Sequence, residues 1–200
     1  MEVISSEVVK NSWLIFWSSY WFFGGIISYY NIRRLDKVLE VSFNIFENML
    51  WSSLGLFLMF HFPIRICSNW KDYNKFLISY VIASVYFYHI HYLLHHPKLY
   101  FLHKKHHRFQ KPWALAGLYC SPFEMIFANT FTASLGPIMT QMSPNYVYFW
   151  NLLMPINVLL SHSGLTIPYF MDNSHDLHHR YFNFNYGINS VLDELYGTKM

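Results

Sequence analysis

Seven histidines occur within nineteen residues, in the stretch HIHYLLHHPKLYFLHKKHH at 89–107, and more follow in SHSG at 161–164 and HDLHH at 175–179. Histidines three or four positions apart on a helix lie on one face, with Cβ atoms about 5–6 Å apart. Neutral imidazole nitrogens are ligands for zinc, copper, iron and nickel. The spacing predicts a metal site built from nine histidines: His91, His95, His103, His106, His107, His162, His175, His178 and His179.

Nine imidazoles exceed the needs of one metal ion. A tetrahedral zinc site uses four ligands, so nine suit two ions. His89 and His96 flank the set and are possible extra ligands or neighbours of the ligands. His61, alone in MFHFP, is expected to be a packed or interfacial residue.

The composition indicates a membrane protein. Apolar residues make up 54% of the 200 residues and aromatic residues 21%, whereas charged residues make up 12%, about half the usual share of a soluble domain. The net charge of +3 is too small to indicate nucleic-acid binding. The first residues lack a basic leader and a small-residue cleavage site, so we expect no cleaved signal peptide. Cys67 and Cys120 fit no zinc spacing and are expected to be buried thiols.

Apolar runs long enough to cross a bilayer predict the fold class. The expected spans are 11–32, 48–64, 76–94 and two more, 125–141 and 145–160, separated by a turn at SPN. The segment RRLDKVLEVSFNIFE at 33–47 is amphipathic and either lies at the membrane interface or extends the next span. We therefore expect one all-α integral membrane domain with four to five transmembrane helices: residues 1–75 form N-terminal transmembrane and interfacial helices, and residues 76–200 form the catalytic region.

The distribution of basic residues predicts the orientation. If the N-terminus lies outside, the cytosolic segments are 33–47, 95–124 and 161–200, and these hold ten of the fourteen Lys and Arg residues, as the positive-inside rule expects. The ten are Arg33, Arg34, Lys37, Lys98, Lys104, Lys105, Arg108, Lys111, Arg180 and Lys199. This topology places eight of the nine histidines in cytosolic segments and His91 near the cytosolic end of the third span, so we expect a cytosolic histidine-rich cap that holds two metal ions.

The histidine boxes and the residues after them resemble a known superfamily. The run HYLLHHPKLYFLHKKHHRFQKPWALAGLYCSPFE, followed by HSGLTIP, HDLHH, NYG and DELYGT, is similar to the fatty acid hydroxylase and sterol desaturase superfamily, and most similar to its C-4 methylsterol oxidase branch. The resemblance covers about residues 76–198.

The resemblance implies a membrane-bound, non-haem di-iron oxidoreductase of the endoplasmic reticulum. With O2, such an enzyme hydroxylates an unactivated C–H bond of a membrane lipid, here a sterol. Fatty-acyl or sphingolipid hydroxylation, desaturation and a catalytically impaired relative are alternatives. The sequence has no dinucleotide, P-loop or haem-attachment motif, so electrons must come from an external NAD(P)H-dependent reductase and a cytochrome b-type donor. The donor is expected to dock near Lys104, Lys105 and Arg108.

Four further residues are expected to support the metal ligands. Asp176 and Asp193 are the carboxylates expected to accept the second imidazole N–H. Asn185 belongs to the family's NYG motif, and Glu124 matches the glutamate of its His-Pro-x-Glu segment. Three positions depart from the family pattern, because Ser121 replaces the histidine of that segment, Tyr92 replaces an arginine and Ser84 replaces an acidic residue.

A histidine-rich metal-binding membrane protein or transporter is the competing hypothesis. Transport requires polar or ionisable groups along a path through the bilayer. The five expected spans contain no Asp, Glu, Lys or Arg, so the sequence favours the enzyme.

Overall fold

The computed structural model describes residues 5–31, 35–61, 70–166 and 174–200, and within these ranges it contains helices and turns but no strand. The all-α prediction is confirmed for this part of the chain. Arg33, Arg34, Arg65 and Cys67 lie outside the described residues. The α-helices are α1 (Ser6–Asn31), α2 (Val38–Phe60), α3 (Asp72–Leu94), α4 (Phe131–Thr140), α5 (Pro144–Ser161), α6 (Ser174–Tyr181) and α7 (Ser190–Tyr196), and a π-helix (Glu124–Thr130) leads into α4.

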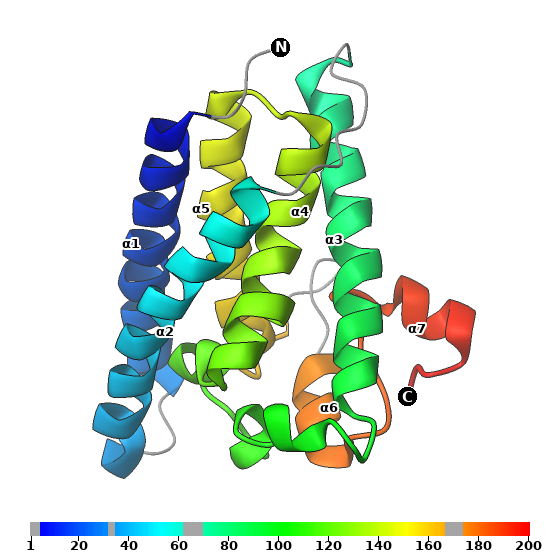
Figure 1. Ribbon diagram of the computed structural model, residues 1–200. Coiled ribbons are helices and arrows are strands. Elements are labelled where there is room, and N and C mark those ends of the chain that lie inside the picture. The colour runs from blue at the N-terminus through cyan, green and yellow to red at the C-terminus, as the bar shows by residue number, and fades with distance from the viewer. Residues whose placement is uncertain (1–4, 32–34, 62–69, 167–173) are drawn as a thin grey trace.

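The long helices form a bundle that is closed at one end by the histidine-bearing segments. Helix α1 packs against α5, α3 packs against α4, and α2 crosses the π-helix and α4. Figure 1 shows α6 and the turns of residues 95–120 at the lower end of the bundle, with α7 beside α3. This arrangement gathers segments from three parts of the chain at one end.

The predicted turn at SPN is present. Gln141 ends α4 in the left-handed conformation, with φ 51°, and Pro144 occupies the first turn of α5, where its missing N–H costs no hydrogen bond. The Ser143 amide donates to Asp72 Oδ1 at 3.1 Å, which ties the turn to the start of α3. Residues 125–160 therefore form a helical hairpin that returns the chain to the histidine end.

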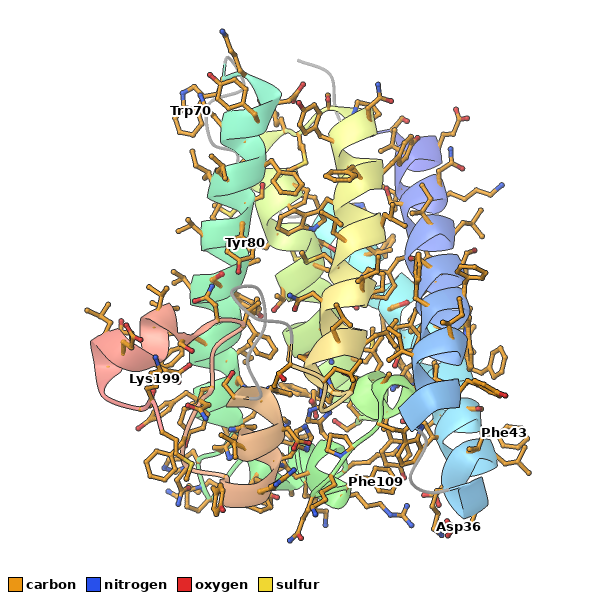
Figure 2. All side chains as sticks on the ribbon, turned by 180° about the vertical axis from the view of Figure 1, so that it is seen from behind. Asp36, Phe43, Trp70, Tyr80, Phe109 and Lys199 are labelled. Carbon is orange, nitrogen blue, oxygen red and sulfur yellow. The ribbon has the colours of Figure 1, made fainter. Side chains whose placement is uncertain are left out.

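The amphipathic segment extends the helix that follows it. A short 3₁₀ turn, Leu35–Lys37, precedes α2, which runs without interruption to Phe60. Val41 and Ile45 are buried, whereas Phe43 is 74% exposed and points away from the bundle in Figure 2. The outward face of α2 is therefore strongly apolar.

The number of membrane spans is not confirmed. Of the helices in the described residues, only α3 is long and apolar enough by length and composition to cross a membrane. Helix α1 contains no acidic or basic residue after Lys10 but is rich in Trp, Tyr and Ser, which lower its mean hydropathy. The expectation for α1 rested on the absence of charge, which is a weaker criterion.

Buried polar groups fasten the segment 113–120 to the bundle. The Tyr20 hydroxyl donates to the Leu115 carbonyl at 2.9 Å and accepts from the Leu118 amide at 3.1 Å. The Asn48 side chain donates to the Leu118 carbonyl at 2.9 Å. Cys120 is a buried free thiol, as predicted. Helices α1 and α2 thus hold the chain that leads from the histidine boxes into the π-helix.

Candidate metal centre

The nine predicted histidines converge into two groups at the closed end of the bundle. Within each group, one nitrogen from every histidine lies within 4.8 Å of those from all the others. The five-histidine group contains His91, His95, His103, His107 and His178, and the four-histidine group contains His106, His162, His175 and His179. Eight of these side chains are buried, and His95 is half-buried.

Helical spacing explains which histidine enters which group. Residues four apart share a helix face, so the pairs His91 and His95, and His175 and His179, stay together. His103 and His107 also stay together, although His103 lies in a turn and His107 in the short 3₁₀ helix His106–Arg108. His106 and His178 lie one position from a paired histidine and point into the other group. Each HxxHH box therefore contributes to both groups.

The distances between nitrogens fit ligation of metal ions. The Nε2 atoms of His162 and His175 are 3.0 Å apart, those of His162 and His106 are 3.3 Å apart, and those of His178 and His107 are 3.1 Å apart. Two nitrogens that each lie about 2.1 Å from the same ion, with an N–metal–N angle of about 90°, are about 3.0 Å apart. Both groups are therefore pre-arranged for an ion.

Several of these nitrogens are buried without a hydrogen-bond partner. They include Nε2 of His91, His95, His103 and His179. An unsatisfied buried polar atom costs roughly 1–3 kcal/mol, and a bound ion would remove that cost. The donor set therefore fits two metal ions.

Backbone carbonyls fix the orientation of three imidazoles. The Nδ1 atom of His91 donates to the Tyr186 carbonyl at 2.8 Å, that of His178 to the Phe184 carbonyl at 2.6 Å, and that of His162 to the Val158 carbonyl at 2.8 Å. Because a carbonyl only accepts, the contacts assign the proton to Nδ1 and leave Nε2 free to bind a metal ion.

Asp193 organises the loop that carries the Tyr186 carbonyl. Its Oδ1 accepts from the Tyr186 amide and the Thr198 hydroxyl, both at 2.8 Å, and its Oδ2 accepts from the Gly187 amide at 2.9 Å. A Cβ on Gly187 would lie 2.4 Å from the Asn189 carbonyl oxygen, so only glycine fits there. The NYG and D-x-x-x-G-T motifs are thus two halves of one hydrogen-bonded unit that supports His91.

Asn185 forms hydrogen bonds with backbone groups, and Asp176 forms an ion pair with an arginine; neither side chain accepts a hydrogen bond from one of the three imidazoles described above. Asn185 has φ 59°, donates to the Ser174 carbonyl at 3.1 Å and accepts from the Met200 amide at 2.9 Å. Asp176 pairs with Arg180, and its Oδ1 is buried without a hydrogen-bond partner. The structure differs here from the sequence-based expectation for Asp176 and Asp193, because backbone carbonyls accept the imidazole N–H groups described above.

Glu124 lies between the two groups. Its Oε2 is 3.0 Å from Nδ1 of His103, in the five-histidine group, although the pair is not aligned as a hydrogen bond. Its Oε1 is 3.7 Å from Nδ1 of His106, in the four-histidine group. One buried carboxyl group therefore contacts a histidine from each group.

Ser121 lies at the start of the helical turn that leads into the π-helix, and it belongs to neither histidine group. Its hydroxyl donates to the Leu102 carbonyl at 2.5 Å and accepts from the Glu124 amide at 3.2 Å. The sequence Ser-Pro-Phe-Glu has the S-x-x-E spacing of a capping box, a signal that the sequence analysis missed. Ser121 thereby connects Glu124 to the residue before His103.

The remaining departures and flanking histidines lie outside the two groups. Tyr92 is 55% exposed, and its ring packs against Tyr186. Ser84 is buried, and its hydroxyl has no hydrogen-bond partner. His89 and His96 are exposed, and His61 is exposed at the end of α2.

Burial keeps the cap histidines neutral. Burial, together with neighbouring imidazoles, lowers the pKa of His95 to about 3 and of His107 to about 2, and burial lowers the pKa of His162 to about 4. Burial, followed by neighbouring imidazoles, also lowers the pKa of five more cap histidines well below its usual value: His103, His106, His175, His178 and His179. Neutral imidazole is the form that binds metal ions. Burial raises the pKa of Glu124 well above its usual value.

A largely apolar cavity of about 90 Å³ reaches the histidines from inside the bundle. His103, His106 and Glu124 lie on its wall together with Phe16, Phe87 and Ala133. Asn129 and Thr132 are polar members of this wall that the sequence analysis did not identify, because no motif marks them. The arrangement can hold a hydrocarbon beside the candidate metal centre and exclude water from it.

Comparisons with known proteins identify similar chains. The family model described as Fatty acid hydroxylase matches residues 76–198, more than half of the chain. The chain is 38% identical over 120 residues to "Fatty acid hydroxylase domain-containing protein 2" of Homo sapiens, which covers 59% of the chain and 36% of that protein. It is 32% identical over 142 residues to a sphingolipid C4-hydroxylase of Schizosaccharomyces pombe, covering 64% of the chain and 48% of that protein.

A third relative is a putative methylsterol monooxygenase of Dictyostelium discoideum, 30% identical over 131 residues, covering 60% of the chain and 49% of that protein. The chain thus matches between about a third and a half of the length of these curated relatives. No solved structure is significantly similar to the chain.

Proposed function

Because the chain belongs to the fatty acid hydroxylase family, we propose that it is a membrane-bound lipid hydroxylase whose nine histidines hold two iron ions. The two groups of converging imidazole nitrogens, several of them buried without a hydrogen-bond partner, are the observation that carries this proposal. Neutral nitrogen donors suit iron, and the apolar cavity beside them suits a hydrocarbon.

The proposed reaction inserts one oxygen atom of O2 into a C–H bond. A C–H bond, O2, two electrons and two protons give a C–OH group and one water molecule. Two bound iron ions would supply the redox chemistry with O2. The five-histidine group and the four-histidine group would each hold one ion, supported by Glu124 between them and by Asp193 through the NYG loop.

The protein's own residues would orient the substrate and protect the reaction. Phe16, Phe87 and Ala133 would hold the hydrocarbon by apolar contact and keep water from the site. Backbone carbonyls at Tyr186, Phe184 and Val158 would keep the Nδ1 protons in place, so that each Nε2 faces an ion.

The electrons would come from an external cytochrome b-type donor with an NAD(P)H-dependent reductase. The Arg108 guanidinium pairs with the Glu40 carboxylate, which offsets its positive charge, and also donates to the Tyr119 hydroxyl at 2.8 Å. The Lys105 ammonium lies 5.2 Å from the centre of the Tyr119 ring. Lys104 is exposed, so Lys104 and Lys105 are the main candidates for an acidic partner. We propose the endoplasmic reticulum membrane, with the histidine end in the cytosol.

A sterol substrate, as the C-4 methylsterol oxidase resemblance implies, competes with a fatty-acyl or sphingoid chain. The relatives include a sphingolipid hydroxylase and a putative methylsterol monooxygenase, so their names do not select one class. Drug-sized ligands usually occupy about 300–1,000 Å³, and the cavity here is about 90 Å³. The small volume favours a chain over a fused-ring nucleus.

A metal transporter is less well supported. The histidines of both groups lie at one end of the bundle and do not extend along a path through it. A transport path would need such groups at successive depths.

The deciding experiment is metal stoichiometry. Purified anaerobically with iron supplied, the protein should bind close to two ions per chain, and His106→Ala and His178→Ala should each lower occupancy and abolish lipid oxidation. His61→Ala, at an exposed position outside both groups, serves as the matched control. A stoichiometry near one with unaffected turnover would exclude the di-metal mechanism.

A further inference from the structure

Three adjoining cavities lead from the side of the bundle to the histidines. The innermost is the cavity of about 90 Å³ described above. A second, of about 30 Å³, shares Phe16, Asn129 and Ala133 with it. A third, of about 420 Å³, lies between the first turns of α1 and the last turns of α2 and shares Trp13 and Leu56 with the second.

The outermost cavity opens sideways through a gap between two helices. In Figure 1, α2 starts beside the C-terminal end of α1 and diverges from it toward Phe60, so the helices are farthest apart near the start of α1. Leu14 and Phe57 line the opening and are 44% and 61% exposed. The opening therefore faces the same surroundings as the exposed apolar face of α2.

We propose that these cavities form the access route along which an unbranched hydrocarbon chain passes from the bilayer to the histidine site. This inference rests on the proposed function and adds to it the direction of access and the substrate class. The three cavities adjoin one another, because each pair of neighbours shares lining residues. A chain that enters between α1 and α2 therefore passes Trp13 and Leu56 first, and then Phe16, Asn129 and Ala133, before it reaches the innermost cavity.

Trp13 is the gate between the outer two cavities. Its indole Nε1 donates to the Ser52 hydroxyl at 3.0 Å, and Trp17 Nε1 donates to the same hydroxyl at 3.1 Å. Trp17 is buried in the core, whereas Trp13 is only partly buried. Rotation of Trp13 breaks one hydrogen bond and leaves Ser52 bonded to Trp17, so the gate can open without disturbing the core.

The narrow second cavity selects the shape of the substrate. At about 30 Å³ between Phe16, Leu56 and Asn129, it passes a chain that is one methylene wide once the side chains rotate. A fused-ring nucleus would require α1 and α2 to separate. The route therefore selects a linear chain.

The test uses a photoreactive diazirine analogue of palmitic acid with the full-length, iron-loaded protein in lipid nanodiscs. Irradiation should attach the probe to peptides from the first turns of α1 and the last turns of α2. Unlabelled palmitate should compete, and a 4-methylsterol should not. Adducts found only on other helices, or competition by the sterol alone, would overturn the proposal.

Substitutions at the shared walls test the route independently of the chemistry. Leu56→Trp should fill the passage and lower both labelling and turnover of a linear lipid at least tenfold, whereas Trp13→Ala should raise labelling. Leu50→Trp, on the 73% exposed face of the same helix, is the matched control and should match the wild type. Iron content should be unchanged in all three variants.

The two hypotheses fail in different ways. If Leu56→Trp is labelled and turns over substrate as well as the wild type, the access route is wrong, but the hydroxylase proposal is unaffected. Loss of the two-ion stoichiometry in the wild type would overturn the hydroxylase proposal, even if the probe still labels α1 and α2.

Discussion

The Nδ1 atom of His91 donates to the carbonyl oxygen of Tyr186 at 2.8 Å, and this contact joins the end of α3 to the loop that precedes α7. The Tyr186 amide in turn donates to Asp193. A backbone carbonyl cannot be removed by substitution, but its position can be changed through the carboxylate that holds the loop. The candidate metal centre can therefore be perturbed by a substitution at Asp193, which belongs to neither histidine group.

Asp193→Asn should weaken metal binding at the five-histidine group. The amide side chain would present an N–H group to a backbone N–H, which loosens the NYG loop and the acceptor of His91. Loss of such a supporting partner typically lowers affinity by about 10–100-fold. Iron titration with mass-spectrometric metal analysis should show one weakened ion and one unchanged ion. Glu194→Gln, at the exposed neighbouring position, should change neither.

Glu124→Ala should weaken both ions, in contrast to Asp193→Asn. The carboxyl group lies 3.0 Å from His103 and 3.7 Å from His106, which belong to different groups. The same titration should show reduced occupancy at both positions, and Glu124→Gln should retain more than Glu124→Ala because it preserves volume. Selective loss of a single ion would show that Glu124 supports only one group.

Ser121→His should lower iron occupancy and lipid oxidation, even though it restores the residue that the family usually has. The hydroxyl holds the Leu102 carbonyl and the Glu124 amide, and an imidazole at this position would displace both. Loss of an N-terminal cap typically costs about 1 kcal/mol. Thermal unfolding should show a lower midpoint for Ser121→His and Ser121→Ala, and Ser121→Thr should restore it. Tighter iron binding in Ser121→His would instead make position 121 part of the ligand set.

The metal-free protein should become less stable as the pH falls below about 6.5. The folded-state pKa of His162 is lowered to about 4 and that of His95 to about 3, so the unfolded chain binds protons first. The stabilisation is present above the unfolded pKa and is lost as the pH falls toward the folded values, with a slope of up to about 1.4 kcal/mol per pH unit for each group. Denaturant unfolding in detergent at several pH values measures this slope. His162→Gln should make this slope shallower.

Cysteine labelling should place the histidine end of the bundle on the cytosolic side. Figure 2 shows Trp70 at one end of the bundle, with Asp36 and Phe109 at the other. In a background with Cys67→Ser, Lys104→Cys and Lys199→Cys should react with a reagent applied from the cytosol, and Trp70→Cys should react from the opposite side. If positions 104 and 199 react from opposite sides, the predicted topology is wrong.

The sequence predicted an all-α fold and the convergence of the histidines, but not the number of spans, the π-helix or the division of the histidines into two groups. The pairs at i and i+4 share a face by helix geometry, so their joint placement could have been anticipated. The placement of His106 depends on the turn at residues 103–108, which no periodic pattern specifies. The acceptors for His91 and His178 are backbone carbonyls, which have no signature in the amino-acid sequence. The sequence analysis therefore assigned this role to Asp176 and Asp193, because only side-chain acceptors can be recognised in a sequence.

Because of the π-helix Glu124–Thr130, the position of the Glu124 carboxyl group depends on the number of residues in this segment as well as on which residues they are. Glu124 is the first residue of the π-helix, which continues directly into α4. Packing against α3 fixes the orientation of α4 about its own axis. Each residue of an α-helix turns the chain by about 100°. Deleting one residue between 124 and 130 would convert the π-helix into an α-helix. The Glu124 side chain would then rotate away from His103 and His106. A family member that lost this single residue would keep every histidine box and still lack the carboxyl group between its two ligand groups.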